Sequence, residues 1–272
     1  MATTGDERTA LMTEPGTGPN TGPLLGDPGD VRAAADELAR GRVVLHGFAT
    51  IHALTARPDR ESVALAHRLK GRPDGRAGGV TTTPDALPGL FDWTRLPAEL
   101  PRRPLRLLME ELYELGPFGF RGPAADSVPD HLTAVRDGVR TTRVVAPGRH
   151  CPSNAFLAAA LDRAGTGLLF TTSFTAPFPT TADRSRALPD VPVLAHADET
   201  AVRERHPHHA AVPVTVVSFH RAAGYGRAGL PALTLERPGS LSAEHLRSVA
   251  ANHGFSLAPA QAPRVYAPSV RR

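Results

Sequence analysis

The sequence is poor in several residue types, and each shortage excludes a class of protein. Its single cysteine, Cys151, has no partner for an intramolecular disulfide, which favours a reducing compartment such as the cytoplasm. No apolar run is long enough to span a membrane, and the first residues lack the apolar core of a secretion signal. Aromatic residues make up 5% of the 272 residues and the net charge is only +4, without a basic run interleaved with aromatics. Direct nucleic-acid binding is therefore not expected.

Lysine is nearly absent, although positive charge is not. Lys70 is the only lysine among 31 lysine and arginine residues. Its survival, where arginine stands everywhere else, indicates a position that needs a compact ammonium rather than a planar guanidinium. In Lys70-Gly71-Arg72-Pro73, cations on either side of a glycine suit a polyanion such as a nucleotide phosphate. The alternative is a helix with a cationic last turn, glycine at its stop and proline beyond, and both interpretations can hold together.

The hydrophobic pattern predicts a single domain with a tail at each end. Residues 1–26 are rich in threonine, glycine and proline and are expected to be disordered, residues 27–257 to form the domain, and residues from 258 onward to be extended. Helices are expected at about 28–40, 60–69, 104–115, 153–164 and 242–252, and strands at 42–46, 143–145, 167–173, 191–194, 213–219 and 230–235. Phe118-Gly119-Phe120 is expected in a turn. The mixture, without a glycine-rich phosphate loop, favours an α/β or α+β sheet covered by helices on one core.

Several short motifs, in this order, resemble the YrdC-like family of threonylcarbamoyl-adenylate synthases and their carbamoyltransferase relatives. The motifs are Lys70-Gly71-Arg72-Pro73, Thr215-Val216-Val217, and Arg237-Pro238-Gly239 followed by Leu241, Ser242 and Glu244. The resemblance covers roughly residues 29–248. It implies a twisted, mostly mixed sheet with a concave, positively charged cavity that binds ATP, threonine and bicarbonate.

The resemblance also implies roles for individual residues. Lys70 and Arg72 would face phosphate or carbonate oxygens, and Arg237 would lie near the nucleotide phosphates, where positioned cations neutralise charge on a transferred group. The residues expected in catalysis are Lys70, Arg72 and His52, and those expected to bind substrate or nucleotide are Thr50, Arg143, Ser173, Thr215 and Arg237. ATP or another adenine nucleotide is the implied cofactor.

The sequence departs from the family at the positions that hold the amino acid. The family's first loop, Pro-Thr-Asp/Glu-Thr-Val-Tyr-Gly-Leu, reads Gly-Phe-Ala-Thr-Ile-His-Ala-Leu at residues 47–54, so Ala49 replaces the acid and His52 the tyrosine. Phe174 replaces the asparagine of the Ser-Ala-Asn signature, and Phe48 and Phe174 are both expected to line the cavity. Each lost hydrogen bond costs about 1–3 kcal/mol. The cations are retained, whereas much of the substrate site is not. The serine and aspartate of the family's later strand are Val214 and Ser218 here.

Other polar groups have less specific patterns. The tract at residues 206–209, His-Pro-His-His, has no tetrahedral metal spacing and is interpreted as a solvated loop, so no metal site is predicted. His46, His52 and His220 are candidates to flank the cavity, and His52 is the preferred acid or base. Cys151, beside a proline, is interpreted as a structural thiol.

Three functions remain open from the sequence. The preferred hypothesis is a divergent YrdC-like protein of specialised (natural-product) metabolism, which keeps the phosphate cradle and acts with a partner enzyme in a group transfer. The alternatives are a carbamoyl- or acyl-adenylate-forming enzyme with another small-molecule substrate, and a genuine ATP-dependent threonylcarbamoyl-adenylate synthase for tRNA modification. The aromatic replacements indicate either a pocket for a more apolar substrate or a plugged pocket in a non-catalytic subunit.

Overall fold

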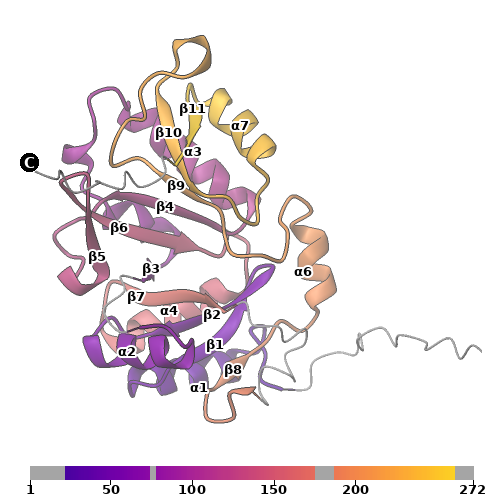
Figure 1. The fold of residues 1–272 in the computed structure, drawn as a ribbon. Helices are drawn as coiled ribbons and strands as arrows, with labels where there is room; N and C mark the ends of the chain where they lie inside the picture. Colours follow the sequence, from indigo (N-terminus) through magenta and orange to yellow (C-terminus); the bar gives the residue numbers. More distant parts are fainter. Residues whose placement is uncertain (1–21, 74–77, 175–186, 261–272) are drawn as a thin grey trace, which may run out of the picture.

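The strands of the chain form one mixed β-sheet, and the helices pack around it (Figure 1). The computed structural model describes residues 22–73, 78–174 and 187–260. The strands lie in the order β11-β10-β9-β4-β6-β3-β7-β2-β1-β8, with β5 paired to β6. Their bounds are β1 (Val44–Phe48), β2 (Ile51–Ala56), β3 (Gly79–Thr81), β4 (Phe118–Pro123), β5 (Thr133–Arg136), β6 (Val139–Ala146), β7 (Leu169–Phe174), β8 (Val193–Leu194), β9 (Val216–Ser218), β10 (Ala232–Arg237) and β11 (Ser256–Pro259). The predicted mixed sheet covered by helices is confirmed, and the buried apolar residues among those described form three clusters rather than one core.

Helices cover the sheet, and most of them begin and end where the sequence predicts. The α-helices are α1 (Pro28–Ala39), α2 (Arg60–Leu69), α3 (Arg102–Leu115), α4 (Ser153–Ala164), α6 (Glu199–Arg205) and α7 (Ala243–Asn252), and the 3₁₀ turns are η1 (Pro84–Leu90), η2 (Trp93–Arg95), η3 (Asp130–Leu132) and η4 (Arg227–Gly229). The Asp27 side chain accepts hydrogen bonds from the first backbone N–H groups of α1, and Pro28 occupies the first turn. No helix within the described ranges is long and apolar enough to cross a membrane.

The helices leave part of one face of the sheet to polar side chains. Phe118 and Phe120 of β4 pack into the main core, which also holds apolar residues of α2, α3 and α7. Because side chains alternate along a strand, Arg121 lies on the opposite face. It stands directly across from Arg143 of β6 and Ser218 of β9. This face, at the end of the sheet with β4, β9 and β10, carries the sites described below.

Strand β10 contains an irregularity that places two consecutive charges on that face. Leu235 pairs with Val217, but Arg237 already pairs with Val216, so Glu236 is an extra residue in the ladder. In a regular strand, Glu236 and Arg237 would point to opposite faces. With the extra residue, each lines a cavity on the same side of the sheet.

The folded part extends slightly beyond both predicted boundaries. Leu25 is buried and Leu24 forms a bridge with Ala195, so the structure begins before residue 27. At the other end, β11 pairs in parallel with β10 as far as Pro259, past the predicted boundary at 257. The rest of the expected tails, 1–21 and 261–272, lies outside the described residues. Residues Phe118 to Phe120, expected in a turn, lie in strand β4.

Candidate functional site

The lysine motif lies at the end of α2 and points its ammonium at strand β7. Lys70 is the C-cap residue, and Gly71 ends the helix in the left-handed conformation with φ of 62°. The Lys70 Nζ donates to Thr172 Oγ1 over 3.1 Å and to the backbone carbonyl of Ser173. Arg72 donates to the same Thr172 hydroxyl over 3.4 Å. The helix stop and the paired cations of the sequence analysis are thus both present.

Further arginines lie close enough to affect the ammonium. Burial, followed by the positive charges of Arg72, Arg143 and Arg237, lowers the pKa of Lys70 from 10.5 to about 7. Burial and the charge of Arg237 likewise lower the pKa of Arg143 to about 10. The Nε of Arg143 is buried and has no hydrogen-bond partner among the described residues. Arg237 donates from Nε and Nη2 to the carbonyl of Val214, over 3.0 and 2.7 Å.

Three of these cations line one cavity with a basic side and an apolar side. Its described lining residues are Phe48, Ile51, Ala53, Arg72, Arg143, Val145, Thr171, Thr172, Ser173, Val214 and Arg237, and none of them is acidic. The space that water-sized molecules can reach is about 20 Å³. Because one buried water needs roughly 10–15 Å³ measured in this way, the cavity holds little more than one. Phe48, buried among Ile51, Ala53, Val214 and Val216, fills much of its apolar side.

Several predicted site residues lie elsewhere. Ser173 lines the cavity, and its strand neighbour Phe174 therefore points to the other face, where it packs in the main core. The expectation that Phe174 lines the cavity does not hold. Thr215 is displaced for the same reason: Val214 lines the cavity, whereas the buried Thr215 hydroxyl donates to the carbonyl of Leu241 over 2.9 Å and accepts from its N–H over 3.0 Å. Thr215 thus fastens the loop after Arg237 rather than facing a ligand.

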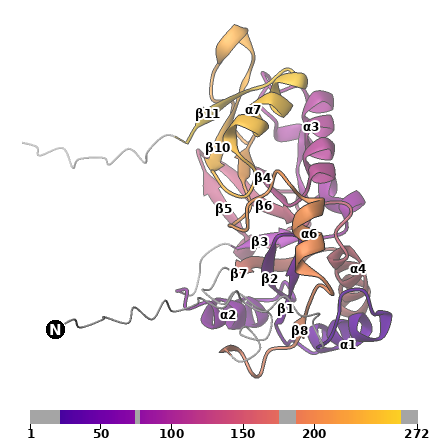
Figure 2. The ribbon, with the colours of Figure 1, turned by 90° about the vertical axis from the view of Figure 1, so that its right-hand side faces the viewer.

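The segment from His196 to Ala210, which includes α6, covers the other residues of the predicted first loop at residues 47–54. His52 is not among the cavity-lining residues; it is buried with its Nε2 3.7 Å from Glu199 of α6. The Thr50 hydroxyl donates to the carbonyl of Ala210 over 3.4 Å. His196 packs against Gly47 so closely that a Cβ there would lie 2.5 Å from the imidazole ring. Figure 2 shows α6 beside the β1–β2 hairpin. The arrangement makes His52 a contact of this covering segment.

The remaining sequence candidates take structural positions. Cys151 is buried, and burial raises the pKa of its thiol, as expected of a structural cysteine. His46 is fully buried, and its Nε2 lies 2.8 Å from Thr55 Oγ1. No group of described histidine, cysteine and acidic residues is arranged to hold a metal ion. The sequence did not point to Arg121, which lines a second cavity and pairs with Glu236, because it lies in no recognisable motif.

The arrangement can bind an anion. Positive charges gathered in a partly buried site repel one another, and this repulsion is part of the reason that the pKa of Lys70 lies near 7. An anion with several oxygens would meet the ammonium and the planar guanidinium groups together. The cavity as it stands is too small for a nucleotide, because small-molecule pockets typically measure about 300–1,000 Å³. Binding one requires Phe48 or the covering segment to move.

Comparison with known proteins finds similar folds at low identity. Sua5 from P. abyssi, solved with L-threonine, has a TM-score of 0.58 and 18% identity, over 85% of this chain and 60% of that chain. A hypothetical protein from Streptococcus mutans has a TM-score of 0.60 and 12% identity, over 84% and 94%. YciO from E. coli has a TM-score of 0.50 and 17% identity, over 69% and 82%. No family model and no curated protein matches the chain.

The chain therefore spans about 60% of the length of the Sua5 structure. At identities below 25%, similarity in the path of the backbone establishes a fold and leaves activity open. The similarity nevertheless covers 85% of the chain for Sua5 and 84% for the Streptococcus mutans protein, and it confirms the resemblance in fold that the lysine and arginine motifs first indicated. The protein has the YrdC-like fold, in a strongly divergent sequence.

Proposed function

We propose that the chain binds the phosphates of an adenine nucleotide at the basic cavity, and serves the transfer of a carbamoyl or related acyl group from an adenylate. The observation that carries this proposal is the cluster of Lys70, Arg72, Arg143 and Arg237 around a cavity whose described lining contains no acid. The positive charges of this cluster repel one another, so the site favours a polyanionic ligand.

The proposed roles follow from chemistry and position. Lys70 and Arg72 share the Thr172 hydroxyl, so an anion that replaces this contact is bound by both cations at once. The buried, unpartnered Nε of Arg143 supplies a further donor. Such donors, already in place, stabilise charge that develops on a transferred phosphoryl or acyl group. The nucleotide would be ATP or an adenylate made from it.

Threonine is not the expected acceptor. The residues at the corresponding positions of the apolar side are Ala49, which is buried, and Val214, which lines the cavity. Neither side chain can hydrogen-bond an amino acid, and each missing contact is worth about 1–3 kcal/mol. We therefore favour a specialised (natural-product) reaction with another small acceptor and a partner enzyme over tRNA modification.

The size of the cavity favours a second candidate, in which the chain is a non-catalytic subunit. With about 20 Å³ reachable by water, the site is closed by its own side chains. If it stays closed, the protein acts through its outer surface on a partner enzyme. Nucleotide binding by the isolated chain separates the two candidates.

The decisive test is calorimetry with ATP, AMP and inorganic pyrophosphate at pH 8, in buffers of different ionisation enthalpy. An anion raises the pKa of Lys70 from about 7, so binding should take up a proton and the observed heat should depend on the buffer. Lys70→Met should abolish both binding and uptake. Lys70→Arg is the matched control. It retains the charge on a planar guanidinium in place of a compact ammonium, so it should bind more weakly than the wild type. Because arginine is already protonated at pH 8, it should take up no proton at this site.

Two results would contradict the proposal. Absence of heat with every adenine nucleotide, with and without a candidate partner enzyme, would remove the adenylate function and leave the subunit role. Release of pyrophosphate from ATP, bicarbonate and threonine at an ordinary enzymatic rate would instead restore threonylcarbamoyl-adenylate synthesis. We expect that release to equal the blank.

A further inference from the structure

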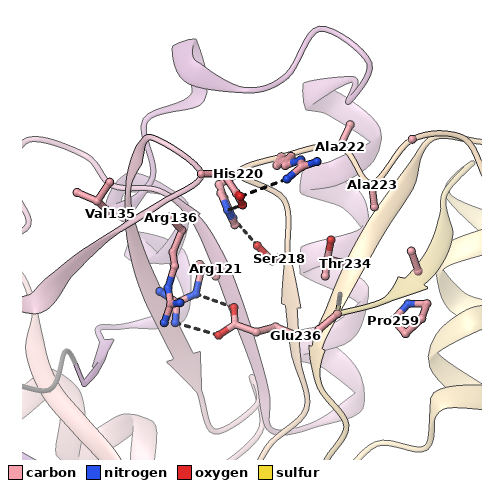
Figure 3. A pocket seen from close by; sticks show the side chains of 15 residues that line it. Arg121, Val135, Arg136, Ser218, His220, Ala222, Ala223, Thr234, Glu236 and Pro259 are labelled. Carbon is pink, nitrogen blue, oxygen red and sulfur yellow. Dashed lines mark hydrogen bonds and ion pairs between the residues drawn. The ribbon is translucent and has the colours of Figure 1, made fainter. Parts of the chain in front are cut away.

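A second cavity, far larger than the first, lies on the same face of the sheet. It has a volume of about 950 Å³ between the β5–β6 hairpin, strands β4, β9 and β10, and the loop after β9 (Figure 3). Nothing in the proposed adenylate function uses it. Arg121, Ser218 and Thr234 line it side by side, because Ser218 is the direct cross-strand partner of both other residues. A row of polar side chains thus forms its floor.

A chain of hydrogen bonds joins three side chains at this floor. Ser218 Oγ lies 2.5 Å from His220 Nδ1, and His220 Nε2 lies 3.1 Å from Asp137 Oδ2. The carboxylate of Asp137 can only accept, so His220 Nε2 must carry a hydrogen. In the neutral ring, Nδ1 is then the acceptor and the Ser218 hydroxyl the donor. The lone pair of a general base is therefore already directed at the proton of a serine hydroxyl, as nucleophilic catalysis requires.

The backbone fixes the position of the carboxylate. Asp137 and Gly138 form the two-residue turn of the β5–β6 hairpin, with φ of 49° and 78°. Two positive φ values are the requirement of a type I′ turn, for which Asp-Gly is a preferred sequence. The other oxygen of Asp137 accepts from Arg221 Nη1 over 3.2 Å. The turn thus holds Asp137 against His220 from across the cavity.

Arg121 supplies positive hydrogen-bond donors next to Ser218. It pairs with Glu236 through Nε and Nη2 over 2.6 and 3.0 Å, and donates from Nη1 to Thr141 over 3.3 Å. These bonds use three of its five N–H groups. Among the described residues, the other two make no hydrogen bond, so they are available to a ligand of the cavity. The volume suits a small organic molecule.

We propose that this cavity is an acyl-transfer site in which Ser218 is the nucleophile, His220 the general base and Asp137 a positioning residue, with a small ester or thioester as the acyl donor. Ser218 Oγ forms a bond to the carbonyl carbon while its proton passes to His220 Nδ1. The carbonyl oxygen, now negative, faces the Arg121 guanidinium. The bond to the leaving oxygen or sulfur then breaks, and His220 returns the proton to the leaving group. Water or another acceptor later removes the acyl group by the same steps.

The site resembles the known Ser-His-Asp arrangement only in the order of its contacts. Serine and aspartate contact the ring nitrogens opposite to those of the serine proteases, and serine and histidine are two residues apart in sequence. The chemistry requires only that the base and the carboxylate contact different nitrogens. Burial lowers the pKa of His220 and outweighs the raising effect of Asp137, so the ring is neutral and able to accept a proton at neutral pH.

The test is labelling of the full-length protein with a fluorophosphonate probe, followed by peptide mapping, and release of nitrophenolate from p-nitrophenyl acetate. The wild type should be labelled at Ser218, and Ser218→Ala should lose this label. His220→Ala should slow labelling by about 100-fold or more, the usual contribution of a general base. Thr166→Val is the control, since it removes a hydroxyl that bonds to the Leu168 carbonyl and lines neither cavity, and it should label at the wild-type rate. Circular dichroism confirms that each variant is folded.

Asp137→Asn separates positioning from structure. Asparagine tolerates the left-handed backbone of the turn, so the hairpin remains. His220 faces Asp137, Arg121 and Glu236, with Arg221 on the far oxygen of Asp137. Removing the Asp137 charge lowers the pKa of His220 further, so the rise of labelling rate with pH should move to lower pH. Absence of label at Ser218 in the wild type, or equal labelling rates without His220 in a folded protein, would overturn the proposal.

Discussion

The two cavities lie on one face of one sheet and differ in how the charges that line them are balanced. The first, about 20 Å³, gathers Arg72, Arg143 and Arg237 beside Lys70 without an acidic residue in its described lining. The second, about 950 Å³, contains arginines that are paired with carboxylates of the protein itself. A cluster of cations with no acid in its described lining favours a ligand of opposite sign, whereas paired charge leaves neutral groups such as Ser218 to do chemistry. The first cavity therefore suits an anion and the second a neutral substrate.

The largest expected effect concerns the closure of the first cavity. Phe48→Ala removes a buried ring and should lower the free energy of unfolding by about 3–5 kcal/mol. If Phe48 is the plug, this variant should also bind ATP more tightly than the wild type in calorimetry. Phe156→Ala, a fully buried ring in a separate apolar cluster, is the control for lost stability alone. Equal or weaker ATP affinity in Phe48→Ala would show that the ring does not obstruct the site.

The next largest effect on the free energy of unfolding is expected from the Arg121–Glu236 ion pair of the second cavity. Burial raises the pKa of Glu236, but the hydrogen bond and charge of Arg121 outweigh it, so the pKa lies below its usual value. Arg121→Met should cost about 1–3 kcal/mol in urea unfolding, because it leaves the Glu236 carboxylate without its bonds. The double variant with Glu236→Gln should lose less than the sum of the single variants. Additive losses would mean that the pair contributes nothing as a pair.

The cations around the first cavity make the free energy of unfolding depend on pH. The pKa of Lys70 is about 7 when folded and near 10.5 when unfolded, so the unfolded chain binds more protons between these values. The free energy of unfolding of the wild type, relative to Lys70→Met, should therefore rise as the pH increases from about 7 to 10.5. Urea titrations at several pH values test this. A difference that stays flat would mean that Lys70 is as well solvated as a surface lysine.

The smallest effect is expected at Asp137. Its carboxylate is half exposed, and exposed ion pairs are worth about 0–1 kcal/mol. Asp137→Asn should thus change the free energy of unfolding by less than about 1 kcal/mol, while altering labelling of Ser218. Measuring both on one sample makes the contrast direct. A much larger loss of stability would show that the carboxylate holds the hairpin itself.

Local signals predicted much of the fold. Asp27-Pro28 marks the start of α1, and Lys70-Gly71 marks the end of α2, because capping groups act within a few residues of themselves. Strand β4 escaped prediction because Gly119 and Gly122 look like turn residues. The structure shows their actual reason: a Cβ at Gly122 would lie 2.2 Å from the ring of Phe219. Close packing of this kind depends on a partner far along the chain.

The candidate site was less predictable, for a reason that is specific to strands. The lysine motif and Arg237 could be identified from their sequence context, and the structure places both at one cavity. Phe174 and Thr215 were expected at the same cavity, yet each points to the opposite face. Successive side chains of a strand point to opposite faces of the sheet. An alignment that is wrong by one residue therefore assigns a side chain to the wrong face. The side of the sheet is decided by long-range pairing.

The extra residue in β10 places the two cavities one residue apart. Glu236 lines the large cavity and Arg237 the small one, and a single peptide bond joins them. The negative charge of Glu236 raises the pKa of both Arg143 and Arg237, so it partly offsets the positive charge of the small cavity from outside its lining. A ligand of the large cavity that neutralises Glu236 should therefore change the affinity of the small cavity for an anion, and linkage requires the same factor in reverse.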